Sequence, residues 1–305
     1  MKILITPYNW YDHPKAGGGE IYLNNLCQQL LSLGHEIKGI ANCKEPFTHD
    51  GIDFVPQLGM EQIWTSNNDL LQWCDVVFTQ LIGSSYGYNK CAQHKKPMFF
   101  FAHNTHLSYP LNIQSKVVYN SHWMASLKLF PDCKSTVLQP IIPYAKPTQG
   151  TKIALINCNE NKGAALFNDM AETLPYQFLG IKGAYGEQIL SDAVEYHEYG
   201  DISWDQIKIL LVPSEIESWS QVASEACIRG IPVICSDLPG LRENLSFAGI
   251  YLDRKDKQGW AHIIDWLMLS DVVYRKQSDL CLKRASEYNS DISAFNNWLI
   301  ENTKY

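Results

Sequence analysis

Short apolar runs that favour β-strands alternate along the chain with segments of helical periodicity, and this alternation is the strongest constraint on the fold. Residues 2–6 form such a run, residues 17–19 are three glycines, and residues 20–33 place apolar side chains at helical spacing. Gly34 is typical of the residue after a helix, and residues 36–41 predict a second strand. A strand, a glycine-rich loop, a helix and a strand form the repeating unit of a doubly wound parallel sheet, so we expect an α/β fold.

The alternation continues in both halves of the chain. The further apolar runs look buried on both faces, as parallel strands usually are. They cover residues 75–80, 97–102, 116–119, 152–156, 177–181, 194–197, 209–212 and 232–235. The C-terminal part instead predicts three helices, at residues 258–269, 272–287 and 293–303.

A proline-rich connector separates two groups of these elements. Residues 139–150, QPIIPYAKPTQG, contain three prolines and a glycine and favour an extended conformation. A chain of 305 residues is long enough for two domains. We therefore predict an N-terminal domain at residues 1–140 and a C-terminal domain, with the terminal helices, at residues 151–305.

Charge and cysteine content restrict the class of function. The formal net charge of −7 argues against an extended basic surface for nucleic acid or anionic membrane. The nine cysteines lie far apart, without a CxxC pair, and there is no apolar signal-peptide region, so we expect reduced thiols in a cytoplasmic protein. No apolar stretch approaches the roughly 18 residues of a transmembrane helix.

Gly17, Gly18 and Gly19 lie between the first strand and the first helix. Glycines let the backbone approach a ligand, and the first N–H groups of a helix attract an anion, so a phosphate is a candidate ligand. The loop lacks both the GxGxxG spacing of dinucleotide-binding folds and the GK[ST] ending of a P-loop. A plain tight turn is the alternative.

The segment from Pro213 to Asp237 carries the stronger signal. A strand ends at residue 212, a polar loop follows, and a helix is expected from near Ser218. The loop therefore follows the carboxyl end of a parallel strand, where such sheets bind ligands. Glu217 falls at the start of this helix and Glu225 lies about two turns further on. Two solvated surface carboxylates are the alternative interpretation.

The sequence PSEIESWSQVASEACIRGIPV, residues 213–233, resembles the P-S-x-x-E-x₇-E-A-x-x-x-G-x-P-V motif of glycosyltransferase family 4 and its relatives. That family also opens with a strand, a GG-E loop, a long helix and G-H-E-[VI]. This chain has GGE at residues 18–20 and GHEI at residues 34–37. The resemblance implies the GT-B architecture, in which two Rossmann-like parallel-sheet domains face a cleft and the last of the C-terminal helices packs back on the N-terminal domain.

The resemblance also implies a nucleotide diphosphate sugar as the donor, bound by the C-terminal domain. Glu217 would hydrogen-bond the donor sugar, and Glu225 would accept hydrogen bonds from the ribose hydroxyls. Backbone N–H groups at the helix start would face the sugar and the diphosphate; they belong to Trp219, Ser220, Gln221 and Val222. Ser220 stands where the family commonly has glycine.

Lys162 matches the lysine of the family's R-x-x-x-x-K-G element, whose two cations hold the diphosphate as the leaving group gains charge. Asn157 occupies the arginine position and supplies neither the charge nor the bidentate geometry. Either another cation replaces the arginine, with Lys182 as a candidate, or the phosphate is bound differently. A solvated lysine at a helix start is the alternative for Lys162.

His103 follows the predicted strand at residues 97–102, where family members often carry a histidine that touches the donor sugar. A structural histidine is the alternative, and His106 is a weaker candidate. No D-x-D sequence and no cluster with metal-ligand spacing occurs, so we expect neither a metal ion nor another cofactor.

The resemblance implies a hexosyltransferase that retains the anomeric configuration, and the lack of a metal-binding motif predicts that it is metal-independent. UDP-glucose is the expected donor by its commonness alone, and the acceptor is a hydroxyl on a glycan, a lipid-linked glycan or another polymer. A hydroxymethylated base in DNA is a minor alternative. A nucleotide-sugar epimerase or phosphorylase of the same fold, or an inactive nucleotide-sugar-binding module, are alternative functions.

Overall fold

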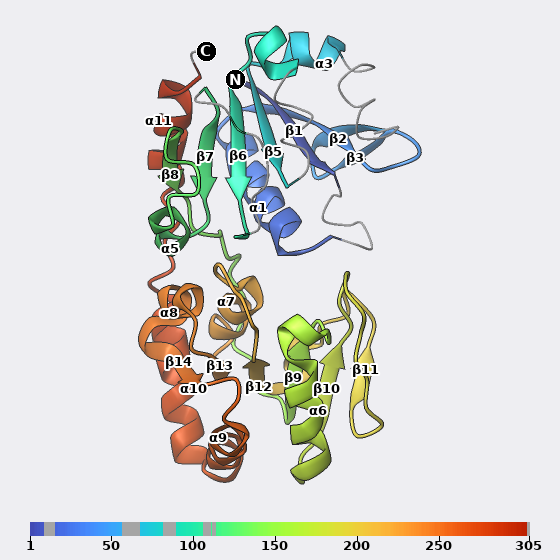
Figure 1. The fold of residues 1–305 in the computed structure, drawn as a ribbon, viewed down its shortest axis with the longest axis vertical. Helices are drawn as coiled ribbons and strands as arrows, with labels where there is room; N and C mark the ends of the chain where they lie inside the picture. The colour runs from blue at the N-terminus through green and yellow to red at the C-terminus, as the bar shows by residue number, and fades with distance from the viewer. Residues whose placement is uncertain (9–15, 57–67, 82–89, 106–110, 112–113, 304–305) are drawn as a thin grey trace. The chain divides into compact units, whose positions relative to one another are not determined.

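The computed structural model describes residues 1–8, 16–56, 68–81, 90–105, 111 and 114–303. The chain forms two units (Figure 1). Unit 1 comprises Met1–Ile141 and Ser290–Tyr305, and unit 2 comprises Ile142–Asn289. Residues 151–305 were predicted as the second domain, with the last helix packing back on the first, and this helix does group with unit 1.

Unit 1 is built on an eight-stranded sheet with the order β3-β4-β2-β1-β5-β6-β7-β8. Neighbouring strands are parallel, except that β3 and β4 are antiparallel. The strands are β1 (Lys2–Tyr8), β2 (Glu36–Ala41), β3 (Phe47–His49), β4 (Ile52–Pro56), β5 (Val76–Gln80), β6 (Met98–Ala102), β7 (Lys116–Tyr119) and β8 (Lys134–Val137). The sequence did not reveal β3, β4 and β8, because these outer strands are partly exposed and lack a continuous apolar run.

Successive residues of the strands contribute to opposite faces of this sheet. Ile3 and Ile5 share a core cluster with α1 (Gly18–Ser32) and α11 (Ile292–Glu301). Leu4 instead joins a cluster with residues of α3 (Asn68–Trp73), and α5 (His122–Ser126) packs near β6 and β7. Helices therefore cover both faces, which is the doubly wound arrangement that the sequence predicts.

The helix α11 is held to unit 1 by apolar and polar contacts. Phe295 is 3% exposed and lies in the same core cluster as Phe99. The Trp298 ring packs edge-on against Phe99, with 5.6 Å between ring centroids. Asn296 Oδ1 is 2.8 Å from His35 Nε2. The last helix thus completes the core of a sheet formed by the first 137 residues.

Unit 2 has a six-stranded, fully parallel sheet in the order β11-β10-β9-β12-β13-β14. The strands are β9 (Lys152–Ile156), β10 (Phe178–Ile181), β11 (Glu195–His197), β12 (Ile207–Val212), β13 (Val233–Ser236) and β14 (Gly249–Leu252). One face packs on α6 (Ala164–Thr173) and α9 (Lys257–Leu269). The other packs on α7 (Gln221–Cys227), α8 (Pro239–Leu245) and α10 (Asp271–Ala285). The half-buried edge strand β14 was not predicted.

The cysteines and the helix lengths were also predicted from the sequence. All nine cysteines are free thiols. Among the described residues, no helix combines the length and the apolar character needed to cross a membrane.

We predict that Phe295→Ala lowers the free energy of unfolding by about 3–5 kcal/mol, because it removes a buried ring from the core of unit 1. Urea unfolding measures the loss, and hydrogen exchange of α1 and β6 amides localises it. Ile300→Ala on the same helix is the control, since Ile300 is 50% exposed and its truncation should change stability by less than about 0.5 kcal/mol. Equal stability of the two variants would contradict the assignment of α11 to this core.

Candidate functional site

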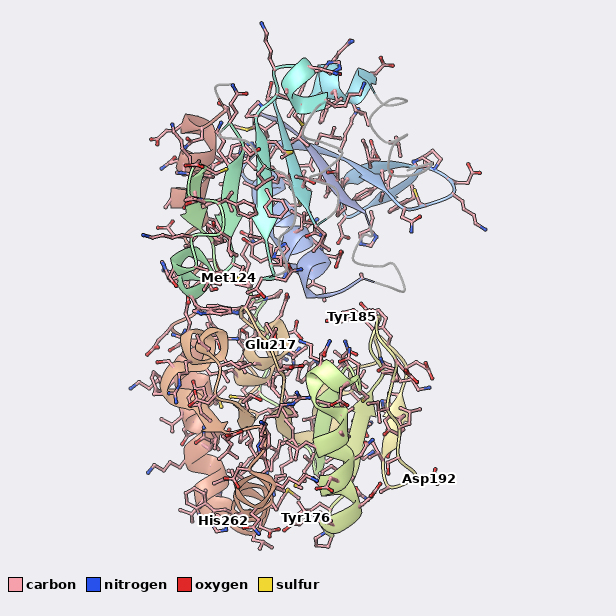
Figure 2. All side chains as sticks on the ribbon, viewed as in Figure 1. Met124, Tyr176, Tyr185, Asp192, Glu217 and His262 are labelled. Atoms are coloured by element: carbon pink, nitrogen blue, oxygen red, sulfur yellow. The ribbon has the colours of Figure 1, made fainter. Side chains whose placement is uncertain are left out.

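Two polar loops of unit 2 lie next to each other at the point where the strand order of its sheet reverses. From β9 the chain adds strands outward through β10 and β11, and it then returns to place β12 on the other side of β9. The carboxyl ends of β9 and β12 therefore flank a topological switch point, the usual ligand site of such sheets. The loop after β9 includes the 3-10 turn η1 (Glu160–Lys162), and the loop after β12 leads into α7. Figure 2 shows Glu217 and Tyr185 at this end of unit 2 and Tyr176 and His262 at the other.

Lys162 and Glu217 join these two loops through an ion pair. Lys162 Nζ lies 2.5 Å from Glu217 Oε1, and Ser214 Oγ donates a hydrogen bond to the same oxygen at 2.9 Å. The side chains of Lys162 and Glu217 are 23% and 10% exposed. Burial opposes the ammonium charge most strongly, but the charge of Glu217, the Tyr185 hydroxyl and the hydrogen bond to Glu217 together outweigh it and raise the pKa of Lys162. Lys162 is therefore a cation at neutral pH.

The backbone around Gly163 brings the two loops together. Gly163 has φ +87°, and a Cβ atom at this position would lie 2.5 Å from the Pro213 carbonyl oxygen. Asn159 Oδ1 accepts a hydrogen bond from the Lys162 N–H at 3.0 Å, and the Glu215 N–H donates to the Asn161 carbonyl at 2.8 Å. The K-G pair recognised in the sequence thus has a steric reason, because only glycine fits this conformation and this contact.

Asn157, which the sequence resemblance aligns with an arginine, is bonded to the surrounding loop in this structure. It has φ +68°, a left-handed conformation that asparagine tolerates. Gln188 Nε2 donates to Asn157 Oδ1 at 3.3 Å, and Gln188 Oε1 accepts from the Gly183 N–H at 2.8 Å. A Cβ atom on Gly183 would lie 1.9 Å from Asn157 Oδ1, so the amide is packed directly on this glycine.

Two other cations lie in this part of unit 2. Lys182, the candidate replacement for the arginine, pairs with Glu198 at 2.6 Å. Arg254, which the sequence did not single out, donates to the Glu160 carbonyl at 2.5 Å and lies 3.7 Å from the carboxylates of Glu160 and Glu215. Arg254 therefore links the same two loops that Lys162 and Glu217 join.

The turn before α7 keeps a glycine-like backbone although it carries a serine. Ser220 has φ +70°, within the left-handed region that favours glycine. Asn244 Nδ2 donates to the carbonyl oxygens of Trp219 and Ser220 at 2.7 and 2.8 Å. The Trp219 indole is 1% exposed and donates to Ser224 Oγ, which in turn donates to Asn244 Oδ1. The buried Asn244 amide holds the turn in this conformation.

This turn corrects the predicted start of the helix. The sequence placed the start near Ser218, but α7 begins at Gln221, three residues later. Trp219 and Ser220 thus belong to the turn, whereas Gln221 and Val222 are the first residues of the helix. Local pattern could not show this, because the amide that stabilises the turn comes from α8.

Glu225 lies in the second turn of α7. Burial raises the pKa of its carboxyl to about 7, although the charge of Arg229 and a hydrogen bond from Gln221 act in the opposite direction. The Arg229 guanidinium lies over the Trp204 ring at 4.5 Å and donates to the Glu225 carbonyl at 2.8 Å. This carboxyl therefore changes its charge near neutral pH.

The glycine loop of unit 1 holds a carboxylate of its own chain. Glu20 Oε2 accepts a hydrogen bond from the Gly17 N–H at 2.8 Å, and α1 begins at Gly18. The N–H of Gly17, which the sequence assigned to an anionic ligand, is thus engaged by Glu20. At Gly19, a Cβ atom would lie 3.2 Å from His103 Cδ2, so glycine here permits close packing on the histidine.

His103 lies beside this loop, after β6. Its Nε2 is 3.0 Å from Gln80 Oε1, and Gln80 Nε2 donates to Glu20 Oε1 at 2.9 Å. The ring packs edge-on against Tyr22, with centroids 5.0 Å apart. Burial lowers the pKa of His103 to about 4, so the imidazole is neutral at physiological pH. His106 lies outside the described residues.

Several residues of these two sites escaped the sequence interpretation. Gln80 is a polar residue at the carboxyl end of a predicted strand, and that position was a usable signal. Ser214 is the serine of the P-S-x-x-E motif, but the sequence interpretation gave it no role of its own. Asn244 lies in α8 and Arg254 follows β14, and both reach the site only in the folded chain, so no local pattern marked them. Among the described residues, no three His, Cys, Asp or Glu side chains are grouped to hold a metal ion.

Comparisons with known proteins identify the fold. No model of a known protein family matches the sequence, and no curated protein matches it. Solved structures do match over nearly the whole chain. HepE from Anabaena, in complex with UDP-glucose, has 14% identity and a TM-score of 0.77, covering 99% of this chain and 98% of that chain. Sucrose-phosphate synthase from Thermosynechococcus elongatus has 15% identity and a TM-score of 0.75, covering 98% of each chain.

A glycosyltransferase from Rickettsia africae is also similar, with 13% identity and a TM-score of 0.74 over 99% of this chain and 97% of that chain. The two α/β domains with largely parallel sheets and the C-terminal helices of this chain match HepE and sucrose-phosphate synthase. The fold of this chain is therefore the GT-B fold of glycosyltransferases, as the sequence predicted.

We predict that Gly163→Ala is more destabilising than Gly200→Ala. Both glycines have φ +87°, but a Cβ atom added to Gly200 would have no atom within 4 Å, whereas one added to Gly163 would abut Pro213. Gly200→Ala should cost about 1–2 kcal/mol of backbone strain. Gly163→Ala should cost a further 1–3 kcal/mol or so from overpacking. Urea unfolding of both variants measures the difference, and equal costs would refute the close contact between the two loops.

We predict that Glu225 makes unit 2 less stable as pH rises from about 4.5 to about 7. In this window the unfolded carboxyl has lost its proton while the folded one retains it, so raising the pH favours unfolding. Glu225→Gln removes this term, and its stability relative to the wild type should therefore increase through the window. Thermal unfolding at several pH values tests this, with the exposed Glu187→Gln as the control. A pH-independent difference between Glu225→Gln and the wild type would refute it.

Proposed function

We propose that this chain is a retaining glycosyltransferase of the family 4 type, which transfers a hexose from a UDP-sugar to an acceptor hydroxyl. The observation that carries the proposal is the Lys162–Glu217 ion pair of 2.5 Å, at the switch point of the unit 2 sheet. Support also comes from the GT-B fold, which this chain shares with HepE in its complex with UDP-glucose. The proposed acceptor is a glycan, a lipid-linked glycan or another polymer.

In this proposal, Lys162 stabilises the diphosphate and Glu217 binds the hydroxyls of the sugar. A lysine ammonium has three donor hydrogens, so Lys162 can keep its bond to Glu217 while it donates to a phosphate oxygen. Its raised pKa keeps the charge in place as the leaving group becomes more negative. Glu225, as a carboxylate, accepts hydrogen bonds from the ribose hydroxyls.

The turn and the glycine loop supply the remaining proposed contacts. Backbone N–H groups of residues 219–222 bind the donor, which fits the glycine-like conformation of Ser220 next to them. The proposal assigns His103 to the donor sugar, as a neutral imidazole. The sequence assigned Gly17–Gly19 to binding of the donor phosphate. The Gly17 N–H is excluded from that proposed role, because it donates a hydrogen bond to Glu20.

The proposed reaction retains the anomeric configuration. The acceptor oxygen bonds to the anomeric carbon on the face from which the diphosphate departs, as the bond from that carbon to the phosphate oxygen breaks. The acceptor proton passes to the leaving phosphate oxygen, and UDP is released. We propose that no metal ion takes part, with Lys162 supplying positive charge, and that the enzyme is cytoplasmic, in keeping with its nine free thiols.

An inactive nucleotide-sugar-binding module is the second candidate, and the surroundings of Asn157 favour it. The amide at this position binds Gln188 and packs on Gly183, and Lys182 is paired with Glu198. A single cation, Lys162, is then assigned to the diphosphate.

One assay separates these functions. The protein is incubated with UDP-glucose and a panel of glycan acceptors in excess EDTA, and the products are resolved by mass spectrometry. UDP release with a glycosylated product supports metal-independent transfer. An isomerised nucleotide sugar would identify an epimerase, and activity that requires inorganic phosphate would identify a phosphorylase. A donor-induced rise in melting temperature without turnover would identify the binding module.

We predict that Lys162→Ala and Glu217→Ala each reduce kcat by about 10²–10³-fold, because each removes an electrostatic contact to the reacting donor. Lys152→Ala is the matched control. Lys152 forms a similar ion pair with Glu195, at 2.6 Å, but it stands at the first residue of β9, the opposite end of that strand. The control should turn over at the wild-type rate. Wild-type turnover by either site variant would overturn the assignment of the site.

A further inference from the structure

Three polar side chains from separate elements form a hydrogen-bonded chain in unit 1. Glu20 lies in α1, Gln80 is the last residue of β5, and His103 follows β6. Glu20 Oε1 accepts from Gln80 Nε2 at 2.9 Å, and Gln80 Oε1 is 3.0 Å from His103 Nε2. Gln80 is fully buried, and Glu20 is 7% exposed. The proposed function assigns no role to Gln80.

The surroundings of Gln80 determine which way its amide points. Its nitrogen faces Glu20 Oε1 and also the Pro7 carbonyl, at 3.4 Å. A carbonyl oxygen can only accept, so the amide NH₂ must lie on that side. The amide oxygen therefore faces His103, and His103 Nε2 must carry the hydrogen that completes the bond.

The other end of the chain is also fixed. The second oxygen of Glu20 accepts from the Gly17 N–H at 2.8 Å, so the carboxylate is bound to the backbone at the start of α1. A Cβ atom on Gly19 would lie 3.4 Å from Gln80 Oε1 and 3.2 Å from His103 Cδ2. Tyr22 packs edge-on against the imidazole and limits its rotation.

We propose that Gln80 is a positioning residue, which transmits the orientation set by Glu20 to His103 and holds its imidazole in the Nε2–H tautomer. Nδ1 is then the acceptor nitrogen of the ring. A hydrogen-bonded partner on one ring nitrogen fixes what the other can do, as in other sites where histidine contacts a ligand. The effect of this orientation on turnover rests on the proposed function, in which His103 contacts the donor sugar.

The tautomer is measured directly on the full-length protein. Long-range ¹H–¹⁵N spectra of ¹⁵N-histidine-labelled protein distinguish protonated from unprotonated ring nitrogens, and His103→Gln identifies the His103 signals. The wild type should show protonated Nε2 and unprotonated Nδ1. Gln80→Leu should give a mixture of tautomers. A wild-type Nδ1–H tautomer, or an unchanged tautomer in Gln80→Leu, would overturn the proposal.

Thr79→Val is the control for disturbance of β5. Thr79 is the preceding residue of that strand and is fully buried, and its hydroxyl has no hydrogen-bond partner among the described residues. The substitution conserves the shape of the side chain, so the His103 signals should stay at their wild-type positions. A shift as large as that in Gln80→Leu would attribute the effect to the strand rather than to the amide.

A double-mutant cycle tests the link to turnover of UDP-glucose. Gln80→Leu should lower kcat/KM by about tenfold or more, as losses of partners that orient a histidine usually do. In a His103→Ala background the same substitution should have no further effect, because Gln80 acts through the ring. Additive losses would show that Gln80 supports the fold instead. The tautomer measurement requires no sugar donor. Inactivity of the wild type would therefore count against the proposed function, and the spectra would still test the role of Gln80.

Discussion

The contact between Gly163 and Pro213 sets the geometry on which the unit 2 site depends. It lets the loops after β9 and β12 approach until their backbones hydrogen-bond. Lys162 and Glu217 are carried by these loops, and Glu225 is carried by the adjoining helix α7. Because the two strands flank the switch point, no helix lies between the loops to separate them. Lys162 and Glu217 then form the ion pair that joins the two loops.

Burial affects both the stability contributed by the ion pair and the pKa of Glu225 at this site. A partly buried ion pair contributes little net stability, since the cost of removing both groups from water offsets their attraction. Its value here is orientation: Ser214 and Lys162 share one oxygen of Glu217, and this fixes the carboxylate. Glu225, with less compensation for its burial, has a pKa shifted to about 7. Two carboxylates of one short segment thus differ in their surroundings and in their proposed tasks.

The topological switch point of the unit 1 sheet carries a different arrangement of polar groups from that of unit 2. Its switch point lies between β1 and β5, and the glycine loop and Gln80 stand at the carboxyl ends of these strands. Here the Glu20 carboxylate lies at the N-terminus of α1. It accepts a hydrogen bond from the Gly17 N–H, and its negative charge interacts favourably with the positive end of the helix dipole. Glu20, beside this loop, is therefore the first member of a buried hydrogen-bonded series that continues through Gln80 to the neutral His103.

The amino-acid sequence by itself determined the alternation of strands and helices, the two mainly parallel sheets and the location of Lys162 and Glu217 close after the ends of strands, because these depend on periodicity and on motifs within one segment. Edge strands such as β8 and β14 escaped, since partial exposure removes the continuous apolar run. Only the tertiary structure decided the turn at Ser220, the packing of Asn157 and the link from Glu20 to His103. Each of these depends on an amide from a distant part of the chain: Asn244, Gln188 and Gln80. A hydrogen bond between segments far apart in sequence leaves no periodic trace, so folding alone brings its partners together.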